Sequence, residues 1–154
     1  SHIDNFRKNS LRRNLFNYLK EKNILCVVAT HDSTDALSFA DEILVIKDGE
    51  VLAKDKPEQI YNHPKSAYMA SLFNDVNEVK EKEIHLDSSS EKTVLLYPNQ
   101  IKKVEKSGLK VTVISSYFKG SYYLIEAQLN EKSIFFEHEA SINKEEEICI
   151  EILN

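Results

Sequence analysis

Leucines recur at four-residue intervals near the start of the chain, at Leu11, Leu15 and Leu19. This spacing places their side chains on one face of an amphipathic helix. Asp4 precedes that helix and can cap it, because its carboxylate accepts from the free backbone N–H groups of the first turn. Asn23 is a typical residue for the helix end.

Two continuous apolar runs follow. Residues 24–29 are uncharged and rich in β-branched side chains, which is typical of a strand buried on both faces of a parallel sheet. A second run at 42–46 precedes the turn signal Asp48-Gly49, and residues 51–53 are expected to pair back as a hairpin. Residues 30–33 would lie at the carboxyl end of the first strand, where open α/β sheets bind ligands. Ser33 or Thr34 is expected to cap a short helix over residues 35–40.

The pattern changes in the second half. Pro57 and Ser66 each begin a short predicted helix, and the charged, serine-rich residues 74–92 are predicted to form a linker or a surface hairpin. Short apolar runs separated by turn residues then predict strands at 93–97, 109–117, 121–129, 133–137 and 147–152. We therefore expect an α/β first half with helices and strands of a parallel sheet, followed by a small all-β barrel or sandwich.

Composition excludes several classes of function. The chain has 154 residues and a net charge of −5, which argues against a nucleic-acid binder that relies on phosphate contacts. Aromatic residues between 117 and 136 could stack on bases, but the acidic residues that flank them would repel phosphates. The two cysteines are too few for a disulfide scaffold or a zinc ribbon, and Cys26 is expected in the core. No apolar run reaches the roughly 20 residues that a membrane helix needs.

His31 has two interpretations when it is taken alone. It is either a loop histidine without a chemical role, or a polar contact to a phosphate or another anion at the sheet edge. His63 and His85 lie far apart in the sequence, so no metal site is expected.

Several segments together favour the second interpretation. They resemble, in order and spacing, the ATPase subunits of ABC transporters. The Thr-His-Asp of the switch-histidine loop and the residues that follow it are matched by residues 29–32 and 35–37. The D-loop is matched by residues 1–4, and the later segments of the same domain by residues 40–43, 47–51, 57–64 and 69–73.

The second half resembles the transport-associated OB (TOBE) domain of importer subunits. Residues 95–101 and 118–129 lie where that family has its Arg-Pro-Glu-Asp and Phe-Leu-Gly stretches. Tyr97 replaces the usual Arg, and Asn99-Gln100 replaces an acidic pair. The resemblance implies that residues 1–75 are the C-terminal part of a nucleotide-binding domain, with helices and a remnant parallel sheet. It also implies a linker at 76–91 and an OB-like accessory domain at 92–154. It is to importers of the iron, polyamine, sulfate and sugar type.

The resemblance also implies the residue roles. His31 would be the catalytic switch histidine that contacts the γ-phosphate, with Thr30 and Asp32 beside it. Ser1 and Asp4 would belong to the D-loop at the dimer interface, although Asp4 could be only a helix cap. The full-length subunit, of which this chain would be the C-terminal part, would use ATP and Mg²⁺. It would form a homodimer with a second ATPase subunit and bind transmembrane permease subunits. It would be cytoplasmic, peripheral on the cytoplasmic face of the membrane, and would couple ATP hydrolysis to solute uptake.

The chain lacks other motifs of that family. It has only three glycines and no Gly-x-x-x-x-Gly-Lys-Ser/Thr phosphate loop. The glutamine loop, the signature motif and the acidic strand that holds Mg²⁺ are also missing, and they would lie upstream of Ser1. The sequence begins without Met, which we interpret as the start of a fragment, and Ser1 and His2 are either native residues or left from a tag. We expect such a fragment to be inactive alone and to hold no cofactor.

Two further expectations follow from these absences. The alternative function is a stand-alone regulatory or ligand-binding module without ATPase activity, whose second half senses a small anion or a protein. The strands at 24–29 and 42–46 would expose apolar faces and unpaired edges, so we expect them to pair through association of chains.

Overall fold

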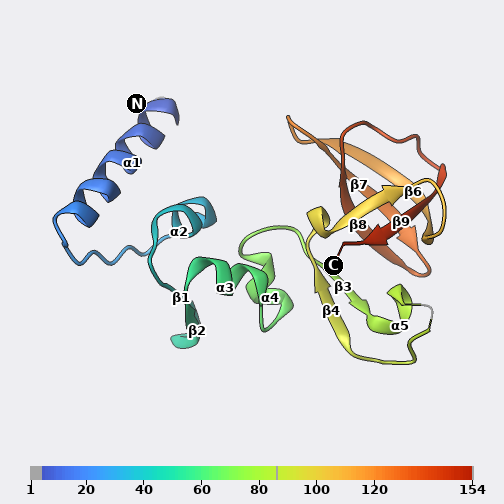
Figure 1. The fold of residues 1–154 in the computed structure, drawn as a ribbon, viewed down its shortest axis with the longest axis horizontal. Coiled ribbons are helices and arrows are strands. Elements are labelled where there is room, and N and C mark those ends of the chain that lie inside the picture. The colour runs from blue at the N-terminus through green and yellow to red at the C-terminus, as the bar shows by residue number, and fades with distance from the viewer. Residues whose placement is uncertain (1–4, 86, 154) are drawn as a thin grey trace. The chain divides into compact units, whose positions relative to one another are not determined.

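The computed structural model describes residues 5–85 and 87–153, with the side chains of the first helix described from Arg7 onward. These residues form two compact units, with the boundary between His63 and Pro64 (Figure 1). The first unit contains helix α1 (Asn5–Glu21), helix α2 (Ser33–Phe39), strands β1 (Ile43–Lys47) and β2 (Glu50–Asp55), and helix α3 (Pro57–Asn62).

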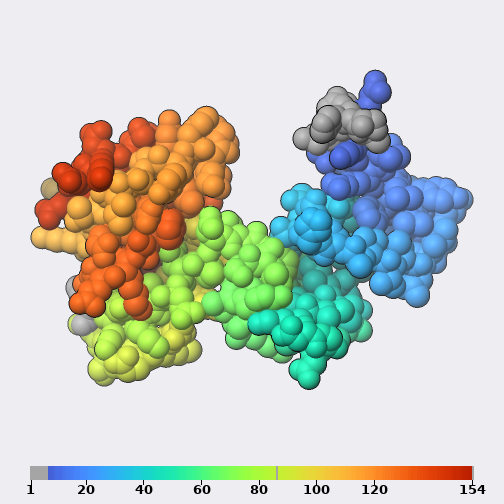
Figure 2. All heavy atoms as spheres, turned by 180° about the vertical axis from the view of Figure 1, so that it is seen from behind, coloured from blue at the N-terminus to red at the C-terminus, as the bar shows by residue number. Residues whose placement is uncertain are grey.

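The second unit begins with α4 (Ala67–Ser71), β3 (Asn77–Lys80), α5 (Glu81–Ile84), β4 (Thr93–Leu96) and the 3₁₀ turn η1 (Pro98–Gln100). It continues with the strands β5 (Ile101–Val104), β6 (Leu109–Phe118), β7 (Tyr123–Leu129), β8 (Lys132–His138) and β9 (Glu147–Ile152). Figure 2 shows the atoms of β6 to β9, coloured orange to red, as one continuous packed body.

Helix α1 confirms the prediction of a helix that ends near Asn23. Asn23 adopts a left-handed backbone with φ 51°, and the Ile24 amide donates to the Leu19 carbonyl at 2.9 Å. These features close the last turn of the helix. The leucine face is not a buried stripe, however, because Leu11 is 67% and Leu15 50% exposed. Asp4, the predicted cap, lies outside the described residues.

The prediction of a buried strand at 24–29 is wrong for this chain. These residues have no regular secondary structure and form no ladder, and all of them are exposed, with Leu25 at 92% and Val27 at 88%. Cys26 is exposed as well and is not in the core. A strand needs neighbours for its backbone groups, and no described strand pairs with this segment. The expectation that its apolar side chains would be exposed is confirmed.

Strands β1 and β2 form the expected hairpin. Lys47 pairs with Glu50, and the two residues between them, Asp48 and Gly49, have φ values of 52° and 81°. Positive φ at both positions is the signature of a type I′ turn, which matches the twist of antiparallel strands. Every strand pairing among the described residues is antiparallel, so the remnant parallel sheet predicted for the first half does not form.

The short helices confirm their predicted starts. Pro57 occupies the first turn of α3, where its missing N–H costs nothing. The Ser66 hydroxyl caps α4 by accepting from the Met69 amide at 3.3 Å.

Strands β5 to β9 form one antiparallel sheet in the order β5-β9-β6-β7-β8. Its two outer strands, β5 and β8, contact each other, so the sheet curls into a small barrel-like body. Fully buried side chains from several strands fill the interior, namely Ile101, Val113, Ile125, Ile134, Phe136 and Ile150. This confirms a small β-barrel-like second half. Strand β5 was missed by the sequence analysis because two exposed lysines, Lys102 and Lys103, interrupt its pattern.

The segment predicted as a linker, residues 76–91, contains β3 and α5. Strand β3 pairs with β4 in antiparallel register, and Val79 and Ile84 are buried in the core of the second unit. Val79 and Ile84 lie among charged residues, so the composition of the segment did not indicate that it contributes to the core.

Asn77 joins this hairpin to the edge of the barrel. Its side chain is only 3% exposed, and its amide group pairs with the backbone of Phe135 on β8. The Asn77 Nδ2 donates to the Phe135 carbonyl at 2.8 Å, and the Asn77 Oδ1 accepts from the Phe135 amide at 2.7 Å. Nδ2 also donates to the Leu96 carbonyl at 3.2 Å. The side chain therefore replaces a neighbouring strand at this point of the β8 edge.

We predict that Asn77→Ala lowers the free energy of unfolding of the second unit by about 2–3 kcal/mol. The substitution leaves the amide and carbonyl of Phe135 without their partner at a part-buried position. Urea unfolding followed by circular dichroism measures this loss. The control is Asn99→Ala, which changes an exposed asparagine on η1 and should cost less than about 0.5 kcal/mol. Equal stability of the two variants would contradict the bridging role of Asn77.

We predict that Gly108→Ala destabilises the same unit by about 1–3 kcal/mol. A Cβ at this position would overlap the carbonyl oxygen of Ile150 and lie 3.0 Å from Cγ2 of Val104. Neither neighbour is the end of a flexible side chain, so the backbone of β9 would have to move. The thermal unfolding midpoint reports the effect, and Lys106→Ala, an exposed change in the same loop, should leave it unchanged.

Candidate functional site

The residues from Thr30 to Asp32 form a short turn that leads into α2. The Asp32 amide donates to Oγ1 of Thr30 at 2.9 Å, and Oδ1 of Asp32 accepts from the Thr34 amide at 2.9 Å. Asp32 is thus the N-cap of α2, and the predicted caps Ser33 and Thr34 lie inside the helix. Asp32 is the capping residue because it lies one residue before Ser33, and its carboxylate reaches the free Thr34 amide of the first turn.

His31 lies between these two hydrogen-bonded residues and is exposed. Within residues 5–85 and 87–153 its imidazole has no hydrogen bond or ion pair. The turn therefore fixes the backbone on both sides of His31 while the imidazole faces solvent. A ring in this setting can contact a ligand without first breaking a protein contact.

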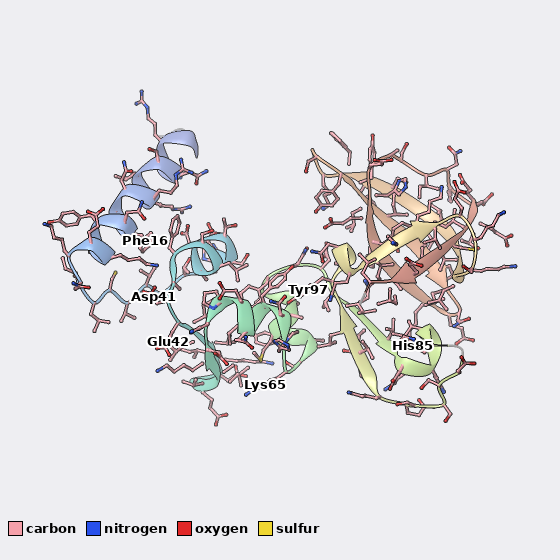
Figure 3. The ribbon with its side chains drawn as sticks, viewed as in Figure 1. Phe16, Asp41, Glu42, Lys65, His85 and Tyr97 are labelled. Carbon is pink, nitrogen blue, oxygen red and sulfur yellow. The ribbon has the colours of Figure 1, made fainter. Side chains whose placement is uncertain are left out.

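A stripe of α1 packs against α2. Arg12, Phe16 and Lys20 follow one another at four-residue spacing, which places them on one helix face. The Phe16 ring stacks on the Phe39 ring with centroids 4.7 Å apart, and Figure 3 shows Phe16 pointing from α1 toward α2. Nζ of Lys20 lies 3.0 Å from Oδ1 of Asp41, just beyond the end of α2.

Arg12 lies at the other end of this stripe, next to the turn that holds His31. Its Nη1 atom is 3.6 Å from Oδ2 of Asp32 and 3.3 Å from Oδ1 of Asp35. One guanidinium thus faces two carboxylates of the first turn of α2. Sequence reasoning missed Arg12, although its four-residue spacing from Phe16 and Lys20 was a usable signal.

The structure brings together only some of the predicted site residues. Thr30, His31 and Asp32 form one turn. Ser1 and Asp4 lie outside the described residues, so their predicted place at an interface stays a prediction. No group of three or more His, Cys, Asp or Glu side chains in the described part of the chain is arranged to hold a metal ion. No described helix is both long enough and apolar enough to cross a membrane.

The aromatic surface of the second unit carries acidic groups. Phe118 is 66% exposed and packs against Tyr123, while the Tyr117 hydroxyl donates to Oε2 of Glu126 at 2.8 Å.

Burial raises the pKa of the Tyr122 phenol, as do the nearby carboxylates Glu137 and Asp75. Burial also raises the pKa of the Glu137 carboxyl. A negative aromatic surface of this kind disfavours the phosphates of a nucleic acid.

Comparison with known proteins identifies relatives of one kind. No protein-family model matches the chain. It is 32% identical over 130 residues to the spermidine/putrescine import ATP-binding protein PotA of Clostridioides difficile, covering 72% of this chain and 38% of that protein. It is 26% identical over 141 residues to the PotA protein of Mycoplasmopsis synoviae, covering 76% of this chain and 31% of that protein.

A further relative is named for the import of a different solute. The chain is 32% identical over 77 residues to the Fe(3+) ions import ATP-binding protein FbpC of Photobacterium profundum, covering 50% of this chain and 22% of that protein. The homologues of this chain are thus ATP-binding subunits of ABC importers. The chain spans less than two fifths of the length of these three curated relatives.

We predict that the chain associates through residues 24–29 and that Leu25→Lys with Val27→Lys abolishes the association. An uncharged segment with open backbone groups can pair with the same segment of another chain, whereas lysines on it prevent such pairing. Light scattering after gel filtration measures the mass, and the unfolding free energy should change by less than about 0.5 kcal/mol because both side chains are exposed. Leu11→Lys on α1 is the control. A monomeric mass for the unsubstituted 154-residue chain at high concentration would contradict the prediction.

Proposed function

We propose that this chain, as a homologue of the ATP-binding subunits of ABC importers, is the C-terminal part of such a subunit. The intact subunit would couple the binding and hydrolysis of ATP to the uptake of a solute of the iron, polyamine, sulfate or sugar type. The relatives named above support the class of protein. The order of the switch-histidine segment, the hairpin and the segment from Pro57 to Pro64 over residues 1–75 supports the placement within it.

The exposed imidazole of His31 is the observation that carries the proposal for the site. Transfer of a phosphoryl group is catalysed mostly by positioning and by stabilisation of charge. A histidine that contacts the γ-phosphate therefore has to be held in place while its ring stays accessible. The hydrogen bonds of Thr30 and Asp32 fix the turn, and the His31 ring is exposed between them.

The rest of the catalytic apparatus would come from the part of the relatives' length that this chain does not span. That part would supply the phosphate loop, the signature motif and the carboxylates that bind Mg²⁺, which neutralises charge on the phosphates when it is bound. His31 alone cannot replace the loop of backbone amides that holds the β- and γ-phosphates. We therefore propose that the chain by itself does not hydrolyse ATP.

The partners follow from the same proposal. Two ATP-binding subunits would form a homodimer, with Ser1 and Asp4 near the dimer interface, and would bind transmembrane permease subunits on the cytoplasmic face of the membrane. The second unit would be an OB-like accessory domain for subunit contact or regulation. Its five-stranded antiparallel sheet, whose outer strands β5 and β8 contact each other, supports this part of the proposal.

We predict that His31→Ala, in the longest gene product that contains this chain, lowers ATP turnover by about 10²–10³-fold, the usual cost of removing one group that stabilises developing charge. A malachite-green phosphate assay measures the turnover. His63→Ala is the matched control, because His63 is also an exposed histidine of the first unit.

Unchanged turnover in the His31 variant would contradict the proposed role. If the wild-type gene product neither binds nor hydrolyses ATP, and a small anion instead binds to residues 92–154, the stand-alone regulatory module becomes the better description. Isothermal titration of the longest gene product with ATP, and of this chain with inorganic phosphate, separates these outcomes.

A further inference from the structure

Helices α1 and α2 are joined at three points along one stripe of α1. Arg12 faces the start of α2, Phe16 packs against its end, and Lys20 pairs just beyond that end. The two ion pairs therefore lie at opposite ends of the contact, with the stacked rings between them. Only the Arg12 end lies beside the turn that holds His31.

The Arg12 contacts engage the residues that define this turn. The two oxygens of Asp32 have separate partners, since Oδ2 faces Arg12 and Oδ1 accepts from the Thr34 amide. The backbone amide of Asp32 is bound to Thr30 at the same time. Asp35 adds a second carboxylate for Arg12, and its side chain is only 15% exposed. A movement of the turn away from α1 would break both of the Arg12 contacts.

We propose that Arg12 is a positioning residue for His31. By holding the first turn of α2 against α1, it sets where the His31 imidazole points. The inference rests on the proposed function of His31, but the contact that it describes exists in this chain and can be measured there. Arg12 does not touch the ligand; it acts through Asp32 and Asp35.

The first experiment uses this chain and needs no ATP. Hydrogen exchange, followed by NMR, reports how often the first turn of α2 opens at the amides of Thr34 and Ala36, which both hydrogen-bond to Asp32. Arg12→Gln should speed their exchange about two- to fivefold, as expected for the loss of a surface ion pair. Lys20→Gln is the matched control, because it removes the other α1–α2 ion pair on the same helix face. It should leave these two amides unchanged.

The second experiment measures ATP hydrolysis by the longest gene product that contains the chain. Arg12→Gln should lower kcat at least threefold and leave KM for ATP within twofold, whereas Lys20→Gln should change neither. A purely structural role would affect both variants alike. Arg12→Lys, which keeps a positive charge toward both Asp32 and Asp35, should retain at least half of the wild-type kcat.

The outcomes separate the two proposals. If His31→Ala leaves turnover unchanged, the proposed function fails, and the exchange experiment still decides whether Arg12 holds the turn. If His31→Ala abolishes turnover while Arg12→Gln and Lys20→Gln behave alike, only the positioning role is overturned. Equal exchange rates at Thr34 and Ala36 in the wild-type chain and in Arg12→Gln also overturn it.

Discussion

The second unit depends on the pairing of one buried side-chain amide with the backbone of an edge strand. Asn77 donates to and accepts from Phe135, as a neighbouring strand would, and so connects the β3–β4 hairpin to β8. An edge strand with open N–H and C=O groups is a site for unwanted pairing with other chains. The same connection holds in place a segment that places Val79 and Ile84 in the core. One polar residue thus protects an edge and anchors a hairpin whose own ladder is short.

The first unit has no comparable anchor in its described residues. The only sheet among the described residues of this unit is the two-stranded hairpin β1–β2, and a hairpin of this size has little stability of its own in water. Its two first helices are joined by a ring stack and by ion pairs that are largely exposed. Exposed ion pairs contribute little to stability, so these contacts specify an arrangement more than they hold it together. The same weakness leaves residues 24–29 without regular secondary structure and open to solvent.

Sequence reasoning succeeded where structure is decided locally and failed where it needs a distant partner. The end of α1 at Asn23, the Asp48-Gly49 turn and the Ser66 cap all follow from the conformations that single residues prefer. The strand at 24–29 failed because a buried strand is a property of a whole sheet, and the described chain provides no neighbour. The bridging role of Asn77 was missed because its partner Phe135 is 58 residues away in the sequence, so no local pattern connects the two residues.

The candidate site shows the same division. His31 was identified from its own tetrapeptide and the segments that follow it, which are local signals. The spacing of Arg12 from Phe16 and Lys20 places it on one helix face, but its two carboxylate partners are 20 and 23 residues further along the chain and follow only from the packing of α1 on α2. This placement has a physical consequence. Helix α1 is continuous over its 17 residues, so Arg12, Phe16 and Lys20 lie on one element. Arg12 therefore links helix α1 to the His31 turn through two carboxylates, and this link does not run through the exposed residues 24–29.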